Sequence, residues 1–352
     1  MISFLIYKLI ICIAVFALSL GVAAYATLWE RKFSALLQDR VGPDRAGKWG
    51  LLQPLADGGK MFFKEEIIPN VSNRFLFILG PCLFMVTAVM TSSVIPWGKD
   101  IITKSGSTFS LQITDINIGV LYLFGVVSIG VYGIMIGGWA SNNKYALLGA
   151  IRASSQMISY EIAMGISVIA LIITCGGTLS LREIVEQQDA GVANIVWQPL
   201  GFLIFFVCAL AETNRAPFDL PECEAELVGG YHTEYSSMKL GLFLFAEYIN
   251  MFISSAVMSA FYFGGYNFPF AQELYQALGL QEGSWIISLI GFGAFFTKIA
   301  LFITVFMWIR WTLPRFRYDQ LMNLGWKILL PLSLLNLAIT VGVEYLRGNI
   351  HF

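Results

Sequence analysis

The chain has few of the side chains that bind metals and cofactors. Its 352 residues include two histidines, His232 and His351, and five cysteines, none of which forms a C-x-x-C pair. Four of the cysteines lie in or at the edge of apolar runs, where cysteine commonly serves as a small buried hydrophobic residue. We therefore expect no haem, zinc or iron–sulfur site held by this chain alone.

Charge is scarce as well, and this excludes further classes of protein. Charged residues make up 13% of the chain, about half the usual share, and the formal net charge is −1. The chain lacks the basic field of a nucleic-acid-binding protein, and no glycine-rich phosphate loop follows a strand. If the protein takes part in a redox reaction, the electrons come from another protein.

Apolar residues fill the sequence instead. They make up 57% of it and form runs of about 17–26 residues, the length that crosses a bilayer. The first run lacks a small-residue cleavage site and is too long for a signal peptide, so we expect it to be retained. We predict an all-α polytopic membrane protein with a single transmembrane domain over residues 1–352. Its eight expected spans are 3–28, 75–95, 113–138, 153–175, 195–211, 239–263, 284–309 and 327–346.

Lysines and arginines indicate which side of the membrane each loop faces. Sixteen of them lie in or at the edge of the loops after spans one, three, five and seven, and five lie on the other side. By the positive-inside rule, the first group faces the cytoplasm and both termini face the periplasm of a bacterial inner (plasma) membrane. An organellar inner membrane is the alternative. The expected cytoplasmic loops are about 29–74, 139–152, 212–238 and 310–326.

The first of these loops contains a candidate amphipathic helix, "LLQPLADGGKMFFKEEIIP". Apolar and charged side chains fall on different faces, as in a helix that lies in the membrane interface. Gly58 and Gly59 weaken such a helix by about 1 kcal/mol each relative to alanine, and a short ordered loop is the alternative. The apolar face carries Leu51, Leu52, Leu55 and Phe62, and the charged face carries Asp57, Lys60 and Lys64.

Three expected spans carry a carboxylate at a similar depth. Glu161 and Glu247 follow the basic residues Arg152 and Lys239 by about 12–14 Å of helix, and Glu212 ends the span between them. An ionisable group at bilayer depth costs about 2.5–3.5 kcal/mol, so it usually marks an ion pathway or a partner. We predict a proton path through these acids. The alternative is that each acid pairs with a base between packed helices.

Other polar residues of the spans extend this prediction. Tyr160 and Tyr248 adjoin two of the acids and can donate hydrogen bonds to them. Lys298 lies near the middle of the seventh span and is a candidate counter-ion for the set. The alternative for Lys298 is a lysine that snorkels toward the interface.

The most acidic stretch of the chain, "ETNRAPFDLPECEAEL", follows the fifth span. Pro217 and Pro221 prevent a helix from continuing through it. Arg215 can pair with Asp219 or Glu222, and the rest of the acids fit a wet acidic cavity; a solvated loop is the alternative. The five carboxylates are Glu212, Asp219, Glu222, Glu224 and Glu226.

Four stretches resemble a known family. They are "ERKFSALLQDRVGPDRAGKWGLLQPLADGGKMFFKE", "GGWASNNKYALLGAIRASSQMISYE", "ETNRAPFDLPECEAELVGGYHTEYSSMKLGLFLFAEY" and "WIRWTLPRFRYDQLMNLGWK". They closely resemble the H-subunit family of NADH-quinone oxidoreductase, the quinone-tunnel membrane subunit of respiratory complex I. The resemblance covers all four cytoplasmic loops and parts of most spans.

The resemblance implies a subunit that forms a narrow quinone chamber and couples quinone reduction to proton translocation. Two peripheral subunits, an iron–sulfur subunit next to the membrane and a hydrogenase-like large subunit, would complete the chamber for ubiquinone or menaquinone. NADH, FMN and the iron–sulfur clusters would belong to partner subunits, with no cofactor bound by this chain alone. Small membrane subunits would connect it to antiporter-like subunits, and lipid would surround it.

The resemblance also assigns residues to these roles. The quinone tunnel and chamber would be lined by Glu30, Arg31, Arg40, Arg45, Asp57, Lys60, Arg215, Phe218, Asp219, Glu222, Glu224, Glu226 and Tyr231. The proton path would include Glu161, Glu212 and Glu247, to which we add Tyr160, Tyr248, Arg152 and Lys298.

Three other functions remain as alternatives. The membrane subunit of an energy-converting hydrogenase shares part of the acidic loop, but the "RVGPDRAG" and "RYDQLM" stretches favour the quinone enzyme. A stand-alone proton or cation carrier would fit the buried carboxylates, but the paired glycine- or proline-interrupted spans of inverted-repeat transporters are missing. A purely structural anchor would not need three acids at one depth.

Overall fold

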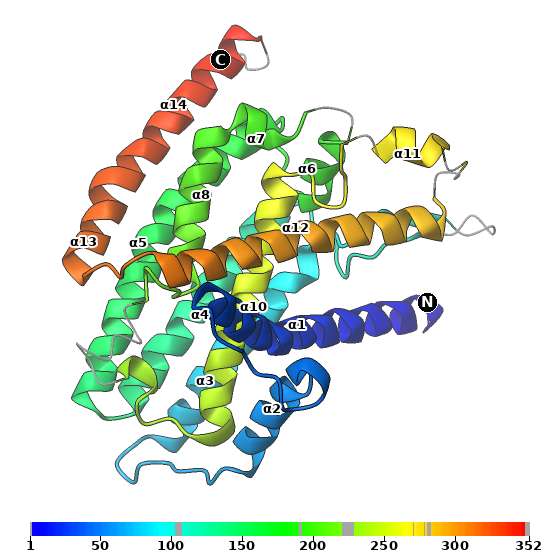
Figure 1. Cartoon of the computed structure of the whole chain (residues 1–352). Coiled ribbons are helices and arrows are strands. Elements are labelled where there is room, and N and C mark those ends of the chain that lie inside the picture. Colours follow the sequence, from blue (N-terminus) through cyan, green and yellow to red (C-terminus); the bar gives the residue numbers. More distant parts are fainter. Residues whose placement is uncertain are drawn as a thin grey trace.

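The computed structural model describes residues 2–102, 108–189, 192–219, 229–269, 271–277, 279 and 283–348, which are mostly helical (Figure 1). The long helices are α1 (Ile2–Leu37), α3 (Arg74–Met90), α4 (Gly119–Ala140), α5 (Lys144–Thr174), α10 (Ser237–Tyr262), α12 (Trp285–Thr312) and α14 (Leu330–Leu346). The shorter helices are α2 (Gln53–Phe63), α6 (Leu181–Gln187), α7 (Asn194–Trp197), α8 (Pro199–Glu212), α11 (Ala271–Ala277) and α13 (Tyr318–Asn323). Three 3₁₀ turns cover Lys48–Gly50, Thr91–Val94 and Gly230–His232, and a π-helical turn over Leu324–Leu329 joins α13 to α14. The strands β1 (Ile101–Ile102) and β2 (Thr108–Phe109) form one antiparallel pair.

The predicted class is confirmed by the helix lengths. Within the described ranges, seven helices are long and apolar enough to cross a membrane. The expected fifth span differs, because α8 has 14 residues and is therefore about 21 Å long at 1.5 Å per residue. This is shorter than the roughly 30 Å hydrocarbon core of a bilayer. The short helix α7 precedes α8, and Gln198 separates the two with a non-helical backbone (φ −128°, ψ 53°).

Two spans begin at residues that hydropathy alone does not predict. α4 begins at Gly119 instead of 113, because the residues before it form a loop in which the Gln112 side chain donates to the Val94 carbonyl (2.7 Å). α5 begins at Lys144 instead of 153, where the Asn143 side chain caps the helix by accepting from the Tyr145 amide (2.9 Å). An apolar run indicates which part of a helix lies in the membrane. The first residue of the helix is set instead by the capping residue or by the loop before it.

Glycines allow α3 and α4 to pack closely. A Cβ atom added to Gly80 of α3 would lie 2.8 Å from the Gly137 Cα atom of α4. A Cβ atom on Gly133 would lie 2.8 Å from the Phe84 backbone nitrogen. Small residues at a membrane-helix interface permit such close backbone contact, which gives packing without a hydrophobic driving force.

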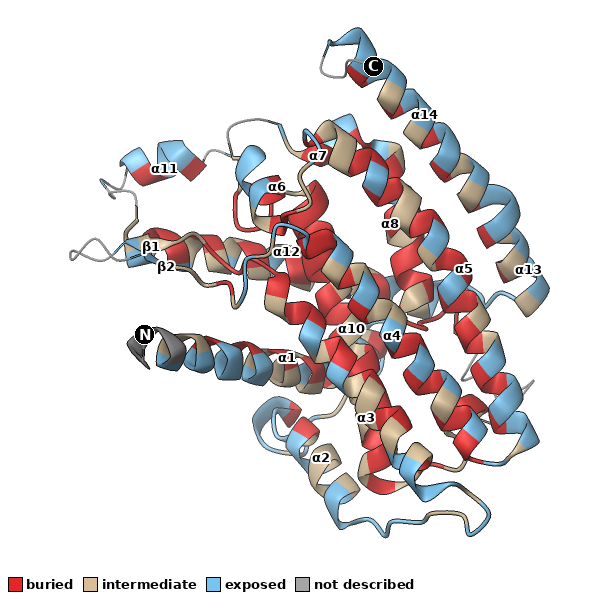
Figure 2. Ribbon diagram, turned by 180° about the vertical axis from the view of Figure 1, so that it is seen from behind, coloured by how far each residue is buried: buried red, intermediate tan, exposed pale blue. Residues whose placement is uncertain are grey.

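α10 forms the centre of the bundle, and the other elements are arranged around it. It contacts α1, α3, α8 and α12, while α14 lies at the outer edge against α5 (Figure 1). Figure 2 shows that buried residues gather along α10 and that much of α1 and α14 is exposed. The exposed apolar side chains of α1 and α14 are those expected of helices that face lipid. Side chains that project from α10 are therefore enclosed by neighbouring helices.

A hydrogen-bonded group of polar side chains holds the peripheral helix α14. The Gln198 amide nitrogen donates to the Thr340 hydroxyl (2.8 Å), and the Asn336 amide nitrogen donates to the Gln198 amide oxygen (3.1 Å). All three residues are buried. Hydrogen bonds between helices are one of the few attractive terms available in lipid, so this group helps to fix α14 to the bundle.

Candidate functional site

A cluster of buried charges lies where α1, α10 and α12 meet the loop after α8. The Arg310 Nη1 atom of α12 is 2.5 Å from Glu30 Oε1 of α1. The guanidinium of Arg215 lies between two carboxylates, 3.6 Å from Glu30 Oε2 and 4.0 Å from Glu247 Oε2. The side chains of Glu30, Arg215 and Glu247 are only 7–8% exposed. Buried charges are tolerated only when they are paired, so this arrangement offsets their desolvation.

Two tyrosines complete the cluster. The Tyr248 hydroxyl donates to Glu30 Oε2 (2.9 Å), and its ring lies 4.0 Å from the guanidinium of Arg215. The Tyr231 hydroxyl donates to Glu247 Oε1 (3.0 Å). These contacts place the charged groups and hydroxyls of the cluster within the few ångströms over which such groups interact electrostatically. We call this set the buried charge cluster: Glu30, Arg215, Tyr231, Glu247, Tyr248 and Arg310.

The loop that carries the arginine of the cluster is anchored from α5. The Gln156 amide nitrogen donates to the carbonyls of Ala211 and Phe218, at 2.7 Å each. The Phe218 ring in turn contacts the rings of Tyr160 (5.6 Å between centroids) and Phe316 (5.5 Å). This anchoring turns the chain back toward α10 immediately after α8 ends.

The acidic stretch makes different contacts from those expected. The carboxylate of Asp219 is buried and pairs with Arg315, 3.2 Å away in the segment after α12. We expected Arg215 to pair with Asp219 or Glu222. Asp219 pairs with Arg315 instead, the guanidinium of Arg215 lies against the two carboxylates of the cluster, and Glu222 lies outside the described residues. The spacing within the loop could not indicate these contacts, because they join residues 213–219 to segments that are distant in the sequence. Glu222, Glu224 and Glu226 lie outside the described residues.

The other two predicted acids lie on α5 and α8. The Ser128 hydroxyl of α4 donates a hydrogen bond to the Glu161 carboxylate. Glu161 is also close enough to Glu212 for their charges to interact. The Tyr160 hydroxyl donates to the Leu321 carbonyl (2.9 Å) and not to the adjacent acid. The structure thus brings two of the three acids together and ties α5, which carries one of them, to α4 and α13.

Two predicted members of the proton path lie apart from these acids. The Lys298 ammonium donates to three backbone carbonyls in the turn 263–267 and forms no ion pair with a described carboxylate. The guanidinium of Arg152 lies over the ring of Tyr318, at 5.7 Å. In the described part of the chain, Arg215 and Arg310 are the cations beside Glu30 and Glu247, whereas the ammonium of Lys298, expected as a counter-ion, lies against backbone carbonyls.

Two adjoining cavities lead to the cluster. The first, about 800 Å³, lies between α1, α2, α3 and α10 and has an almost entirely apolar lining, which includes Leu20, Leu55 and Met85. The second, about 240 Å³, is lined by cluster residues and by charged residues of α1 and α2. Four residues line both cavities: Ala24, Pro54, Gly58 and Phe245. An apolar cavity therefore adjoins a smaller cavity with a charged lining.

The predicted amphipathic helix forms a wall of both cavities. α2 begins at Gln53, and its exposed side chains include Leu55 and Phe62. Asp57 ties it to α1, with its carboxylate 2.7 Å from Arg31 and 2.8 Å from Lys60. Partial burial raises the pKa of the Asp57 carboxyl, but the hydrogen bond from Lys60 and the charge of Arg31 outweigh it and hold this pKa below its usual value.

Two residues that the resemblance assigns to the tunnel lie outside both cavities. Arg40 and Arg45 are exposed in the segment between α1 and α2. Arg40 donates to the side chains of Gln38 (2.7 Å) and Ser34 (3.4 Å). Their exposure leaves them accessible to another protein.

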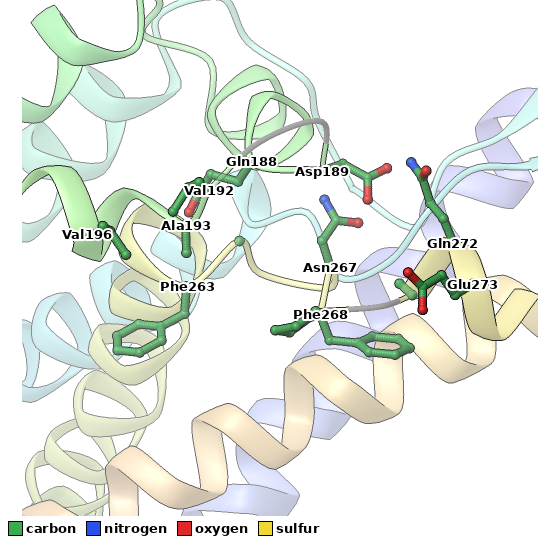
Figure 3. Close-up of a pocket in the computed structure, with 13 residues that line it drawn as sticks. Gln188, Asp189, Val192, Ala193, Val196, Phe263, Asn267, Phe268, Gln272 and Glu273 are labelled. Atoms are coloured by element: carbon green, nitrogen blue, oxygen red, sulfur yellow. The ribbon is translucent and has the colours of Figure 1, made fainter.

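A third cavity, of about 510 Å³, lies at the other end of α10 (Figure 3). Several polar side chains in its wall are already bonded within the chain. Gln188 donates to the Ala260 carbonyl (3.0 Å), Asn267 donates to the Val185 carbonyl (3.0 Å), and Asp189 pairs with a lysine at 2.7 Å. These bonds hold α6 against the end of α10. The polar side chains that line this cavity therefore stabilise the packing of the helices.

Sequence reasoning missed three side chains that shape the site. Arg310 was counted only as a basic residue of a loop, Ser128 is one of many serines in the spans, and Gln156 lies within a predicted span. A polar amide in an apolar run was the one available signal for Gln156.

In the described part of the chain, no group of three or more His, Cys, Asp or Glu side chains is placed to hold a metal ion.

The fold and the site define a polytopic helical membrane protein in which an apolar cavity leads to a cluster of buried, paired charges. Residues 9–341 match the NADH dehydrogenase family, and the chain belongs to that family. It is 67% identical to the first of the NADH-quinone oxidoreductase H subunits of Cytophaga hutchinsonii, over 96% of this chain and 97% of the relative. It is 59% identical to the H subunit of the Flavobacterium johnsoniae enzyme, over 99% and 97%. It is 47% identical to subunit 8 of the Rhodothermus marinus enzyme, over 93% of each. The resemblance read from the four sequence stretches is thereby confirmed.

Proposed function

We propose that this chain is the membrane subunit of a proton-pumping NADH-quinone oxidoreductase. In this role it admits a quinone from the bilayer and couples the reduction of that quinone to proton translocation through buried carboxylates. The observation that carries the proposal is the junction of the apolar cavity with the charged cavity. The family and the names of the relatives support the same reaction.

The two cavities match the two parts of a quinone. Its isoprenoid tail is apolar and suits the cavity lined by α1, α2, α3 and α10, while its polar headgroup passes toward the charged end. Ligand sites commonly combine a mainly apolar wall with a few convergent polar groups. α2 lies along the passage, so its exposed apolar face would rest in the membrane interface beside the opening.

The buried charge cluster supports a coupling role. Reduction of a quinone to a quinol takes up two electrons and two protons, so the charge near the headgroup changes transiently. One unit charge at about 4 Å from another is worth roughly 4 kcal/mol at an effective dielectric of 20. Arg215 lies at that distance from Glu30 and Glu247, so it would shift between them when a neighbouring charge appears. Glu212 and Glu161 would then extend the path toward α5 and α4.

Partner subunits supply the electrons in this proposal. NADH, FMN and the iron–sulfur clusters would be held by these partners, as the family of the chain suggests. The exposed Arg40 and Arg45 would face the two peripheral subunits that close the chamber. The membrane would be the bacterial inner membrane, with α2 on its cytoplasmic side and both termini in the periplasm.

Photo-crosslinking in the assembled enzyme tests the proposal. A quinone that carries a photoreactive group on its tail should label residues of the apolar cavity, such as Leu55 and Phe245. An excess of unlabelled quinone should abolish the labelling. Labelling confined to partner subunits, or to the cavity at the opposite end of α10, would refute this role for the chain.

A further inference from the structure

Among the described residues, the ammonium of Lys298 is held by backbone carbonyls alone. Its Nζ atom donates to the carbonyl oxygens of Phe263 (2.6 Å), Gly265 (2.8 Å) and Asn267. An ammonium has three N–H donors, so three carbonyls satisfy all of them. We call the three oxygens the carbonyl cradle. The lysine comes from the middle of α12, whereas the cradle belongs to the turn that follows α10.

The local sequence of that turn directs the three carbonyls toward one point. α10 ends at Tyr262, and the next residues include Gly264 (φ 71°) and Gly265 (φ 54°). Glycine occupies this left-handed region without the steric cost of a Cβ atom. The turn is closed by hydrogen bonds from the Gly265 amide to Ser259 (2.8 Å) and from the Asn267 amide to Gly264 (2.8 Å). The cradle is thus a built feature of the backbone.

The electrostatics of the cradle favour a cation of single charge. The C-terminal end of a helix carries about half a unit of negative charge, and α10 is a helix of 26 residues. Rings of backbone carbonyls elsewhere replace the hydration shell of monovalent cations. We propose that the cradle is a monovalent-cation site that Lys298 fills from within the chain. In a chain that lacks this ammonium, the cradle takes up a free alkylammonium or alkali cation.

Occupation of the cradle fixes the turn against its neighbours. Phe263, Asn267 and Phe268 form part of the cavity wall in Figure 3, and Asn267 also donates to the Val185 carbonyl (3.0 Å). A buried thiol lies nearby and can report on this packing. The Asn194 amide nitrogen contacts both Cys175 Sγ (3.4 Å) and the Phe261 carbonyl (2.9 Å) in the last turn of α10.

Chemical rescue of Lys298→Ala tests the cation site. Membranes that contain the full-length chain are incubated in methylammonium, potassium or choline chloride at equal ionic strength. The rate of maleimide labelling of Cys175 is then measured by mass spectrometry. In choline, we expect Lys298→Ala to label at least about tenfold faster than the unmodified chain. Methylammonium should restore slow labelling with a saturable dependence on concentration, and potassium should do so in part.

Two further variants separate the effect of charge from the effect of packing. Lys298→Met fills the same space without a charge, so it should label fast in every salt and resist rescue. Lys298→Arg keeps the cation and should label slowly in choline. Cys82, which lies on α3, provides the internal reference and should not respond to the salt.

Three outcomes would overturn the proposal. One is a Lys298→Met chain that labels as slowly as the unmodified chain, because no cation would then be needed. Another is equal labelling of Lys298→Ala in methylammonium and choline. The third is a Lys298→Ala chain that is absent from the membranes in both salts. None of these measurements depends on quinone reduction, so they stand apart from the function proposed above.

Discussion

Replacing Glu247 with glutamine should uncouple proton translocation and leave the fold intact. Glutamine has nearly the shape of glutamate, and its amide oxygen can still accept the hydrogen bond that Tyr231 donates at 3.0 Å. The change therefore removes one charge from the buried charge cluster and little else. The partner that loses an attraction is Arg215, whose Nη2 atom lies 4.0 Å from Glu247 Oε2.

The magnitude follows from that distance and from the burial of the pair. At 4 Å the attraction is worth about 1 kcal/mol in bulk water and about 4 kcal/mol at an effective dielectric of 20. Both side chains are only 7% exposed, so the larger value applies. About 4 kcal/mol corresponds to roughly a thousandfold change in an equilibrium constant. Glutamine also avoids the desolvation of a carboxylate, several kcal/mol, so the free energy of unfolding should change by less than about 2 kcal/mol.

The assay compares two activities of the assembled enzyme in sealed vesicles. We expect proton translocation per NADH oxidised by quinone to fall at least about tenfold in Glu247→Gln. Electron transfer from NADH to an artificial acceptor, which is chemistry of the partner subunits, should be unchanged. Glu344→Gln is the matched control, because Glu344 is also a buried carboxylate in an ion pair, 3.0 Å from Arg347, but lies on α14 away from the cluster. Normal pumping in Glu247→Gln would refute the coupling argument.

Three more predictions concern the passage, the packing and the interfacial helix. Gly58→Phe should raise the KM for quinone about tenfold without destabilising α2, because a Cβ atom at Gly58 meets nothing within 4 Å while a large ring narrows the passage. Gly133→Val should lower the free energy of unfolding by about 1–3 kcal/mol, since its Cβ atom would overlap α3, and denaturation in detergent measures this. Asp57→Asn should loosen α2 by about 0.2–1 kcal/mol at neutral pH, seen as faster amide exchange after correction for intrinsic rates. Because the pKa of Asp57 is lowered on folding, its contribution is complete above the ordinary aspartate pKa of about 4 and is lost as the pH falls through the lower folded value.

Each of these predictions has a control within the chain. Gly58→Ala adds little volume and should leave the KM unchanged; an equal effect of alanine and phenylalanine would contradict the idea of a passage. Gly125→Val lies on the same helix as Gly133, but its Cβ atom meets nothing within 4 Å, so it should cost less than about 0.5 kcal/mol. If both valine variants destabilise equally, close packing is not the cause. Exchange in α2 that stays the same in Asp57→Asn would show that the link to α1 contributes nothing.

The membrane class, most of the spans and α2 were predictable because they depend on local properties of the sequence. A long apolar run must be shielded from water wherever it lies, and a helix satisfies its backbone without help from other segments. The spacing of Leu55, Asp57 and Phe62 likewise indicated a helix with an apolar and a charged face before any neighbour was known. Hydropathy was less reliable at the helix ends, where a cap such as Asn143 or the loop before Gly119 decides the boundary.

The apolar-run argument also identified Glu161, Glu212 and Glu247, because a carboxylate in an apolar run is conspicuous at any position, while Glu30 and Tyr231 came from the family resemblance. Only the tertiary structure decided which charge meets which. Arg215 contacts Glu30 and Glu247 instead of its loop neighbour Asp219, and Lys298 meets the end of α10 instead of an acid. Helix crossings and the path of the loop after α8 set these partners. Buried charges interact over a few ångströms in space, and their separation along the chain does not determine that distance.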